Sequence, residues 1–456
     1  MNRYFLDPFG CVKNQVDAEN MMFYLQKAGW ESVSEAEAAD LIIVNSCGFI
    51  ESAKQESINA VLEWRKHYPG KKILLAGCLA QRYAKDLKEI LPEADNFLGV
   101  GDPSQVVKAA QATLETNPVL SKIKSSPQIT FTETGERPLL SLPGSAYVKI
   151  SEGCSNNCSY CAIPLIRGEL VSRSIPDIID ECRLLLKRGI VELNIIGQDV
   201  GAYGMDKENK SKLPELLNAI SKLEGHFWVR LLYIHPDHFP LQILDIIERD
   251  KRFLPYFDIP FQHAAPEILT VMNRKGTAET HLTLLETIRT RLPDAVIRST
   301  FMLGFPGETE EHFAALLDFQ KKANLDWLGC FVYSREEGTT SYSMKGRVPA
   351  KIAAKRKQTI EERQISITEK NMKRFTGLTL DVLVEELFSA SAADPDETNL
   401  FNEENIWLGR LYCQAPEVDG AAVIVSTEKS TDDLQLGTLI KCKVAARRGF
   451  DLEVQV

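Results

Sequence analysis

Short apolar runs alternate with helical stretches along most of this chain, which limits the folds that it can adopt. In the first part, apolar residues three and four apart mark helices at Asp17–Ala28 and Ser52–His67. The strand-length runs between them are Arg3–Asp7, Leu41–Val44 and Ile73–Leu75. Strands that alternate with helices form parallel sheets, so we predict a small parallel α/β domain over residues 1–135. Its last part, Gln111–Pro138, reads as a linker.

The same rhythm returns between residues 140 and 348 with six strand-like runs. They are Ala146–Ile150, Glu192–Ile196, Val229–Tyr233, Phe257–Pro260, Val296–Leu303 and Gly329–Tyr333. Six units predict a closed or partial βα barrel with its site at the carboxyl ends of the strands. Ala350–Lys373 has no helix breaker and is expected to connect this barrel to the tail. The tail begins at Leu378 and alternates short strands with turns, which predicts a small β-barrel over 378–456. Its predicted strands are Leu380–Val384, Ala422–Val425 and Leu439–Val444.

The composition is that of a globular protein, with 44% apolar and 25% charged residues in 456. No apolar run approaches the roughly 18 residues that cross a bilayer, and residues 1–10 lack a signal-peptide pattern. We therefore expect a cytoplasmic protein. Ten cysteines in a reducing compartment point to metal binding or catalysis rather than to disulfides.

Three cysteines follow the first strand of the predicted barrel, in Cys154-Ser-Asn-Asn-Cys158-Ser-Tyr-Cys161. Three thiolates at this spacing wrap one cuboidal iron–sulfur cluster, and soft sulfur ligands favour such a cluster over magnesium or calcium. No fourth cysteine follows nearby, so one iron stays open for a chelating molecule. The alternative is a zinc knuckle, which closes with a nearby fourth ligand, whereas the next histidine is His226.

A second set of cysteines is dispersed along the N-terminal domain. Cys11, Cys47 and Cys78 each follow one of its three predicted strands. Because ligands bind outside the carboxyl ends of strands in an open α/β sheet, these thiols are expected to share one site. A second three-thiolate cluster is the predicted occupant, and inert core thiols are the alternative.

The spacing of Cys154, Cys158 and Cys161 resembles the motif of the radical S-adenosylmethionine superfamily. With the N-terminal triad, the resemblance narrows to the methylthiotransferases and covers the whole chain. It implies an N-terminal parallel α/β cluster domain (1–135), a partial (βα)6 radical SAM barrel with its connecting helix (140–375), and a small C-terminal β-barrel, the TRAM domain (378–456). The implied cofactors are two 4Fe-4S clusters and S-adenosylmethionine.

Within this family, several segments look more like the branch that modifies ribosomal protein S12 than like the tRNA branch. They include Gly10-Cys-Val-Lys-Asn-Gln-Val-Asp-Ala-Glu19, Val44-Asn-Ser-Cys-Gly-Phe-Ile-Glu51 and Ala415-Pro-Glu-Val-Asp-Gly420. The tRNA branch typically has Gln-Met-Asn after its first cysteine, where this chain has Val12-Lys13-Asn14. The resemblance implies methylthiolation of an aspartate β-carbon in S12 with two S-adenosylmethionine molecules. It implies an electron donor such as a flavodoxin or ferredoxin, and we expect neither membrane nor direct nucleic-acid binding.

Residues beyond the six cysteines are assigned less directly, and no catalytic residue is predicted besides the cluster ligands. Gln198 is expected to hydrogen-bond S-adenosylmethionine, and Arg298 to hold its carboxylate as a fork donor. A strand-end turn and a buried ion pair are the respective alternatives. Gly304 is expected in a turn that contacts the cofactor, with simple turn chemistry as the alternative. His235 and His263 are expected to be structural.

The charge is uneven along the chain. From Leu378 onward there are 15 acidic and 6 basic residues, a net of −9, whereas the remainder carries 48 and 47, a net of −1. RNA binding calls for a positive surface, so an acidic tail fits a basic protein substrate better. The nearer alternative is a MiaB-like tRNA adenosine methylthiotransferase. The distant one is an iron–sulfur electron carrier or sensor, which needs fully cysteine-ligated clusters.

Overall fold

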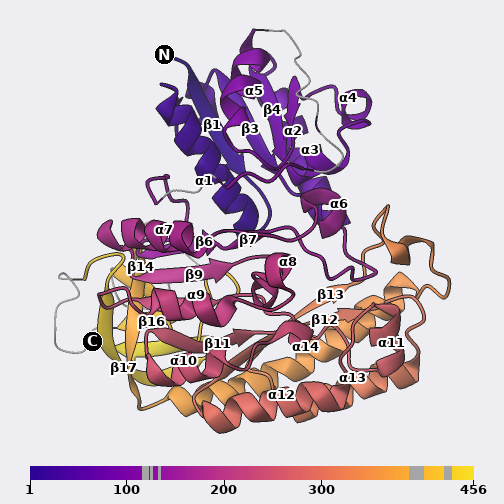
Figure 1. The fold of residues 1–456 in the computed structure, drawn as a ribbon, viewed down its shortest axis with the longest axis vertical. Helices are drawn as coiled ribbons and strands as arrows, with labels where there is room; N and C mark the ends of the chain where they lie inside the picture. Colours follow the sequence, from indigo (N-terminus) through magenta and orange to yellow (C-terminus); the bar gives the residue numbers. More distant parts are fainter. Residues whose placement is uncertain (116–122, 124–126, 132–134, 390–404, 426–433) are drawn as a thin grey trace.

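The computed structural model describes residues 1–115, 123, 127–131, 135–389, 405–425 and 434–456, and it contains three main sheets (Figure 1). The first is a parallel sheet of order β2-β1-β3-β4-β5. Its strands are β1 (Arg3–Pro8), β2 (Glu31–Ser32), β3 (Leu41–Ser46), β4 (Lys72–Gly77) and β5 (Asn96–Leu98). Its helices are α1 (Val12–Lys27), α2 (Glu51–His67), α3 (Cys78–Arg82), α4 (Leu87–Ile90) and α5 (Gln105–Leu114).

Both faces of this sheet are covered because its central strands are apolar throughout. Leu41 and Ile43 of β3 pack with α1 and α5, while Ile42 and Val44 pack with Val61 of α2 on the other face. The period of two along a strand separates these two sets. The parallel domain predicted from the sequence is therefore confirmed, although α1 begins five residues earlier than predicted.

The second sheet is parallel and open, of order β13-β12-β11-β10-β9-β6, so the partial-barrel prediction is confirmed. Its strands are β6 (Ser145–Lys149), β9 (Glu192–Ile196), β10 (Trp228–Leu231), β11 (Phe253–Asp258), β12 (Val296–Leu303) and β13 (Trp327–Val332). A small antiparallel pair, β7 (Ser151–Glu152) and β8 (Val171–Ser172), follows β6. The helices are α6 (Ile163–Arg167), α7 (Ile175–Lys187), α8 (Met205–Glu208), α9 (Leu213–Ile220), α10 (Ile243–Arg249), α11 (Pro266–Val271), α12 (Ala278–Arg291) and α13 (Glu310–Ala323).

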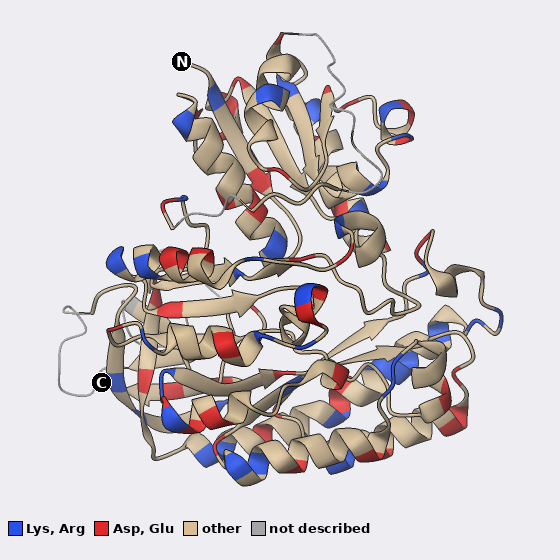
Figure 2. Ribbon diagram, in the orientation of Figure 1, with Lys and Arg blue, Asp and Glu red and all other residues tan. Residues whose placement is uncertain are grey.

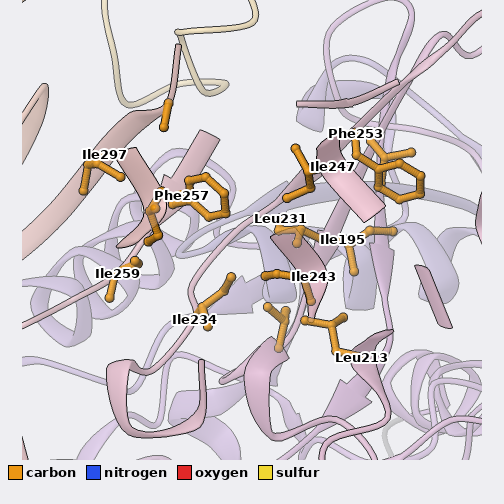
Figure 3. Packing of buried hydrophobic residues seen from close by; sticks show 14 of the residues in the cluster. Ile195, Leu213, Leu231, Ile234, Ile243, Ile247, Phe253, Phe257, Ile259 and Ile297 are labelled. Carbon is orange, nitrogen blue, oxygen red and sulfur yellow. The ribbon is translucent and has the colours of Figure 1, made fainter. Parts of the chain in front are cut away.

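The largest core lies between this sheet and its helices. Ile195, Leu231 and Phe257 of three neighbouring strands meet Leu213 of α9 and Ile243 of α10 (Figure 3). This packing fixes the strands rigidly, so that the loops at their carboxyl ends have defined positions.

The connecting helix, α14 (Ala350–Met372), leads to a closed five-stranded barrel of order β14-β15-β16-β18-β17. Its strands are β14 (Thr379–Ser389), β15 (Asn405–Leu411), β16 (Ala422–Val425), β17 (Leu439–Arg448) and β18 (Asp451–Gln455). One core joins this barrel to Trp228, Tyr256 and Trp327 of the second sheet. Arg410 of β15 donates to Glu192 of β9 across the same interface, so the two barrels pack as one unit.

Candidate functional site

The three N-terminal cysteines meet at one end of the first sheet. Cys11 precedes α1, Cys47 follows β3 and Cys78 begins α3, and the parallel register of β1, β3 and β4 brings these ends together. The loops touch: a Cβ added at Gly10 would lie 3.3 Å from Cys47 Sγ, and one at Gly48 would lie 2.8 Å from the Cys78 carbonyl oxygen. Glycine at both positions allows the three loops to close around one site.

The barrel domain contributes a cation to this N-terminal triad. Arg167, the last residue of α6, donates from Nη2 to Cys78 Sγ at 3.2 Å, and Cys78 Sγ lies 3.2 Å from Asn14 Oδ1. Burial raises the pKa of Cys78 to about 12, although Arg167 opposes this shift. A bound metal would remove the thiol proton and supply the missing positive charge. Arg167 was not singled out from the sequence, because its role depends on a contact between domains.

The barrel cysteines lie on one loop after β7. The amide of Cys154 donates to the carbonyl of Gly168 at 3.1 Å, and the amide of Cys161 donates to the carbonyl of Cys158 at 3.0 Å. The loop turns at Asn157, whose φ of 53° is left-handed. These backbone bonds aim three side chains from eight residues into one region.

Apolar and cationic groups surround this loop. Tyr160 packs edge-on against Phe305 at 6.4 Å in a cluster that includes Cys158 and Cys161. Arg274 Nη1 lies 4.0 Å from Cys158 Sγ and 3.3 Å from the Tyr160 hydroxyl. Burial raises the pKa of Cys161, so its thiolate also needs a positive partner. A cluster in this place would have apolar side chains and a fixed cation beside it, and the sequence did not assign that cation.

The two triads are brought together by contacts between the first two domains. Val12 and Val16 of α1 pack against Tyr147 of β6 and Ile196 of β9. Figure 1 shows the N-terminal domain seated on this side of the barrel, with α6 between them.

Gln198 belongs to a buried charged network at this interface. Its Nε2 donates to Glu152 Oε1 at 2.6 Å, and Glu152 also accepts from Arg167 and Lys149 at 2.9 Å each. Asp17 of α1 pairs with the same two cations at 2.8 and 2.7 Å. Gln198 Oε1 is buried without a hydrogen-bond partner among the described residues, which leaves an acceptor for a ligand.

Arg298 and Gly304 have other neighbours. Arg298 Nη1 lies 3.4 Å from Asp258 Oδ1, and its Nε lies 3.4 Å from Asp419 Oδ1 of the C-terminal barrel. Arg298 therefore has the ion pairs of the alternative interpretation, and its contact with S-adenosylmethionine stays a prediction. Gly304 has a φ of 76° and donates from its amide to Glu308 Oε2 at 2.6 Å. Its turn carries Phe305 to the cysteine loop, but its cofactor contact also stays a prediction.

A cavity of about 300 Å³ lies behind Cys154. It is lined in part by Asp199, whose Oδ2 accepts from Asn156 at 3.0 Å and lies 2.8 Å from His238 Nδ1. His235 also lines it, and its Nδ1 accepts from the Asp237 amide at 3.2 Å. Asp199 thus holds the cysteine loop to the ends of β9 and β10, which is a structural role.

Among the described residues, no group of three His, Cys, Asp or Glu side chains is placed to hold a single metal ion. A cuboidal cluster binds each thiolate to a different iron, so its ligands stand further apart than those of a single ion. The two cysteine triads, their adjacent cations and their apolar walls fit such clusters. Every helix of the described residues is too short or too polar to span a membrane.

Three family models match the chain, one in each part of the fold. They are "Uncharacterized protein family UPF0004" at residues 3–99, "Radical SAM superfamily" at 148–319 and "TRAM domain" at 376–456. The chain is 48% identical to the ribosomal protein uS12 methylthiotransferase RimO of Treponema denticola, over 98% of this chain and 99% of that one. It is 39% identical to the same-named protein of Syntrophomonas wolfei, over 99% of each.

The chain belongs to the RimO family. It is a radical S-adenosylmethionine methylthiotransferase, and the UPF0004 and radical SAM domains of RimO bind two 4Fe-4S clusters and S-adenosylmethionine. The fold has solved counterparts outside this family. The methyltransferase TsrM from Kitasatospora setae, solved with tryptophan substrate and a SAM analogue, matches with a TM-score of 0.56 at 14% identity, over 88% of this chain and 81% of that one. The likeness to TsrM concerns the fold alone.

Proposed function

We propose that this chain methylthiolates the β-carbon of an aspartate in ribosomal protein uS12, using two S-adenosylmethionine molecules and two 4Fe-4S clusters. The observation that carries the proposal is the contact between the barrel domain and the N-terminal triad: Arg167, six residues after Cys161, donates to Cys78. A sulfur donor site and a radical site must share one cavity if one substrate carbon is to react with both. The names of the relatives, which match nearly the whole chain, supply the substrate.

The ligands that we propose are six cysteines. Cys11, Cys47 and Cys78 would hold the N-terminal cluster, and Cys154, Cys158 and Cys161 would hold the cluster that binds S-adenosylmethionine. When bound, the clusters supply the electron that splits S-adenosylmethionine and the site at which the sulfur group is held.

The surrounding residues position these groups and exclude water. Arg167 and Arg274 donate toward Cys78 and Cys158, which stabilises the negative charge of the sulfur ligands. Tyr160 and its apolar neighbours keep water from the barrel triad. A radical formed in such an enclosure reacts with the bound substrate rather than with solvent.

The contacts to S-adenosylmethionine are also part of the proposal. The unpartnered Oε1 of Gln198 would accept a hydrogen bond from the cofactor, since Glu152 already holds the amide nitrogen. Gly304 would contact it through the turn that reaches the cysteine loop. Arg298 would hold its carboxylate only after release from Asp258.

The domain limits and cellular partners complete the proposal. The three working units are residues 1–135, 140–375 and 378–456, with a flavodoxin or ferredoxin as the electron donor. The enzyme acts in the cytoplasm, where ten free cysteines stay reduced.

The decisive experiment offers two substrates at once. Anaerobically reconstituted protein receives S-adenosylmethionine, a reductant, sulfide, uS12 and adenosine-modified tRNA, and both products are analysed by mass spectrometry. We expect a methylthio group on an aspartate of uS12. A methylthio group on tRNA alone would keep the chemistry and overturn the substrate.

Cysteine variants divide the reaction between the two triads. Cys47→Ala is expected to abolish methylthiolation while 5′-deoxyadenosine still forms, whereas Cys158→Ala is expected to abolish both. Cys182→Ala is the matched control, because Cys182 is buried in the barrel core away from both triads. Loss of 5′-deoxyadenosine in Cys47→Ala at unchanged barrel-cluster content would contradict this division.

A further inference from the structure

Lys13 is a cation at the meeting point of the two triads. It is the second residue of α1, two positions after Cys11, and it is half-buried. Its Nζ lies 5.4 Å from the centre of the Tyr233 ring, just beyond the end of β10. No described carboxylate lies within ion-pair distance of Nζ, although most other cations of this region are paired. The ammonium group of Lys13 thus has no counter-charge among the described residues and is available to an anionic ligand.

The neighbouring cations show the contrast. Arg167 is bound by the carboxylates of Asp17 and Glu152. Lys149 is bound by the same two carboxylates, at 2.7 and 2.9 Å. Arg298 has the two carboxylates described above. Each of these side chains is held by the protein, so none is free to receive an anionic substrate without breaking a buried ion pair.

The ring of Tyr233 holds the ammonium group of Lys13 beside the barrel triad. Its φ of 69° is rare for a bulky residue, and its carbonyl accepts from the Val200 amide at 3.1 Å, which holds the backbone there. Burial raises the pKa of Tyr233, and Tyr160, Cys161 and Cys158 add to the rise while Arg274 opposes it. An ammonium group is attracted to the face of such a ring and so stays at this place.

Helix α1 is itself fixed against the barrel on both sides of Lys13. Val12 precedes Lys13, and Val16 lies one turn later, and both pack against Tyr147 and Ile196. The ammonium therefore cannot leave the gap between the triads by movement of its helix alone. A rigid cation between two reactive centres is suited to orient an anionic target.

We propose that Lys13 is the residue that recognises the target side chain, by binding the carboxylate of the substrate aspartate. This inference rests on the proposed function. The carboxylate is bonded to the β-carbon, so an anchor on the carboxylate holds the reacting carbon within one bond of a fixed point. An adenosine has no carboxylate, so a tRNA substrate would make no such contact.

The test is a binding measurement with two forms of the substrate. Full-length, anaerobically reconstituted enzyme is titrated with uS12 and with uS12 in which the methylthiolated aspartate is replaced by asparagine. We expect Lys13→Met to weaken binding of unmodified uS12 about tenfold, as for loss of a charged hydrogen bond. Lys13→Arg is expected to retain most of the affinity, because the charge is kept.

The two substrate forms isolate the proposed contact. Wild-type enzyme should bind the asparagine form about tenfold more weakly than unmodified uS12, whereas Lys13→Met should bind both forms equally. Lys27→Met is the matched control: it makes the same change at the far end of the same helix and should leave both affinities unchanged. Iron content is measured for each variant to show that both clusters are present.

Three results would overturn the assignment. They are unchanged affinity in Lys13→Met, an equal loss for both substrate forms, and wild-type enzyme that does not distinguish aspartate from asparagine. If wild-type enzyme neither binds nor modifies uS12, the proposed function itself fails, and the assignment of Lys13 fails with it. If Lys13→Met loses iron, the wild-type comparison and Lys13→Arg decide the outcome.

Discussion

The ring of His281 on α12 is enclosed by aromatic side chains. It lies 4.6 Å from the Phe261 ring and 6.1 Å from that of Phe319, and neither ring nitrogen has a hydrogen-bond partner among the described residues. Burial, helped by the charge of Arg274, lowers the pKa of His281 to about 4. The folded protein therefore keeps this ring neutral at pH values where the unfolded chain protonates it.

This shift predicts a loss of stability in acid. Above about pH 6.5 the ring is neutral in both states, and as the pH falls toward 4 the unfolded chain binds a proton that the folded protein rejects. The cost reaches about 3 kcal/mol below pH 4. We expect His281→Leu to raise the melting temperature relative to wild type progressively between pH 6.5 and 4.5. A pH-independent difference would show that the ring does not titrate in this way.

Single residues differ in how far their roles can be predicted from sequence. The six cysteines could be found because a motif and strand ends mark them. Arg167, Arg274 and Lys13 could not be assigned a role, since each acts on a residue far away in the chain. Arg298 could be placed on its strand, but its ion pair with Asp419 depends on how the C-terminal barrel packs.

At the scale of elements, the turn after β12 is held by two glycines in the left-handed region. Gly304 has a φ of 76° and Gly307 a φ of 90°. A Cβ at Gly304 would lie 2.4 Å from Ala353 Cβ of α14, whereas a Cβ at Gly307 meets nothing within 4 Å. Both positions need glycine for their backbone, but only Gly304 needs it for packing.

We expect the two alanine substitutions to separate strain from overlap. Gly307→Ala should cost about 1–2 kcal/mol from the left-handed backbone alone. Gly304→Ala should cost a further 1–3 kcal/mol, about the usual cost of overpacking, because α14 must move. Thermal unfolding measures both, and Ala353→Gly should recover part of the second loss. Equal losses of stability in the two variants would mean that α14 moves aside without cost.

Elements could be predicted where the pattern is simple. The runs at 192–196, 296–303 and 422–425 have the observed bounds of β9, β12 and β16. Strand β11 begins four residues before its predicted start. The additional residues include Pro255, and a proline ordinarily argues against a strand. The structure absorbs it by a register shift: Val229 pairs with Phe253 and Leu231 with Phe257. Strand β15 was missed; its buried Arg410 donates to Glu192 of the second sheet.

At the scale of the whole molecule, charge was a weaker guide than the cysteines. Of the 15 acidic residues after Leu378, eight fall in 390–404 and 426–433, outside the described residues. Two more, Glu385 and Asp419, are buried against Arg410 and Arg298. Acidic and basic residues are interspersed along the described ribbon (Figure 2). More than half of the acidic residues behind the expected docking surface therefore lie outside the described residues, and that surface stays a prediction.

The position of the N-terminal domain over the barrel depends on Glu336, in the loop after β13. Its carboxylate accepts from Arg82 of α3 at 2.7 Å and from Lys54 of α2 at 3.1 Å, and its side chain is 2% exposed. Burial raises the pKa of Glu336, but hydrogen bonds from Ser334 and these two cations lower it by more. One buried carboxylate thus pairs with two cations of the other domain, which no local sequence pattern reveals.

Removal of this charge is expected to loosen the two domains without unfolding either. Glu336→Gln leaves Arg82 buried without a counter-charge and leaves Lys54 with only the exposed Glu51, a loss of about 3–5 kcal/mol that falls on the interface. Amide hydrogen exchange in α2 and α3 should rise while exchange in the barrel core stays constant. Glu337→Gln is the matched control, because Glu337 is exposed and contacts Arg82 only through its backbone carbonyl.

The activity of the loosened enzyme tests whether the two cysteine triads must stay together. With both clusters loaded, Glu336→Gln should form 5′-deoxyadenosine at the wild-type rate, because the barrel triad is intact. Its yield of methylthiolated uS12 should fall severalfold, since the sulfur group is no longer held near the substrate carbon. A normal yield together with raised exchange would show that the reaction tolerates movement between the domains, and the requirement for a fixed common cavity would have to be abandoned.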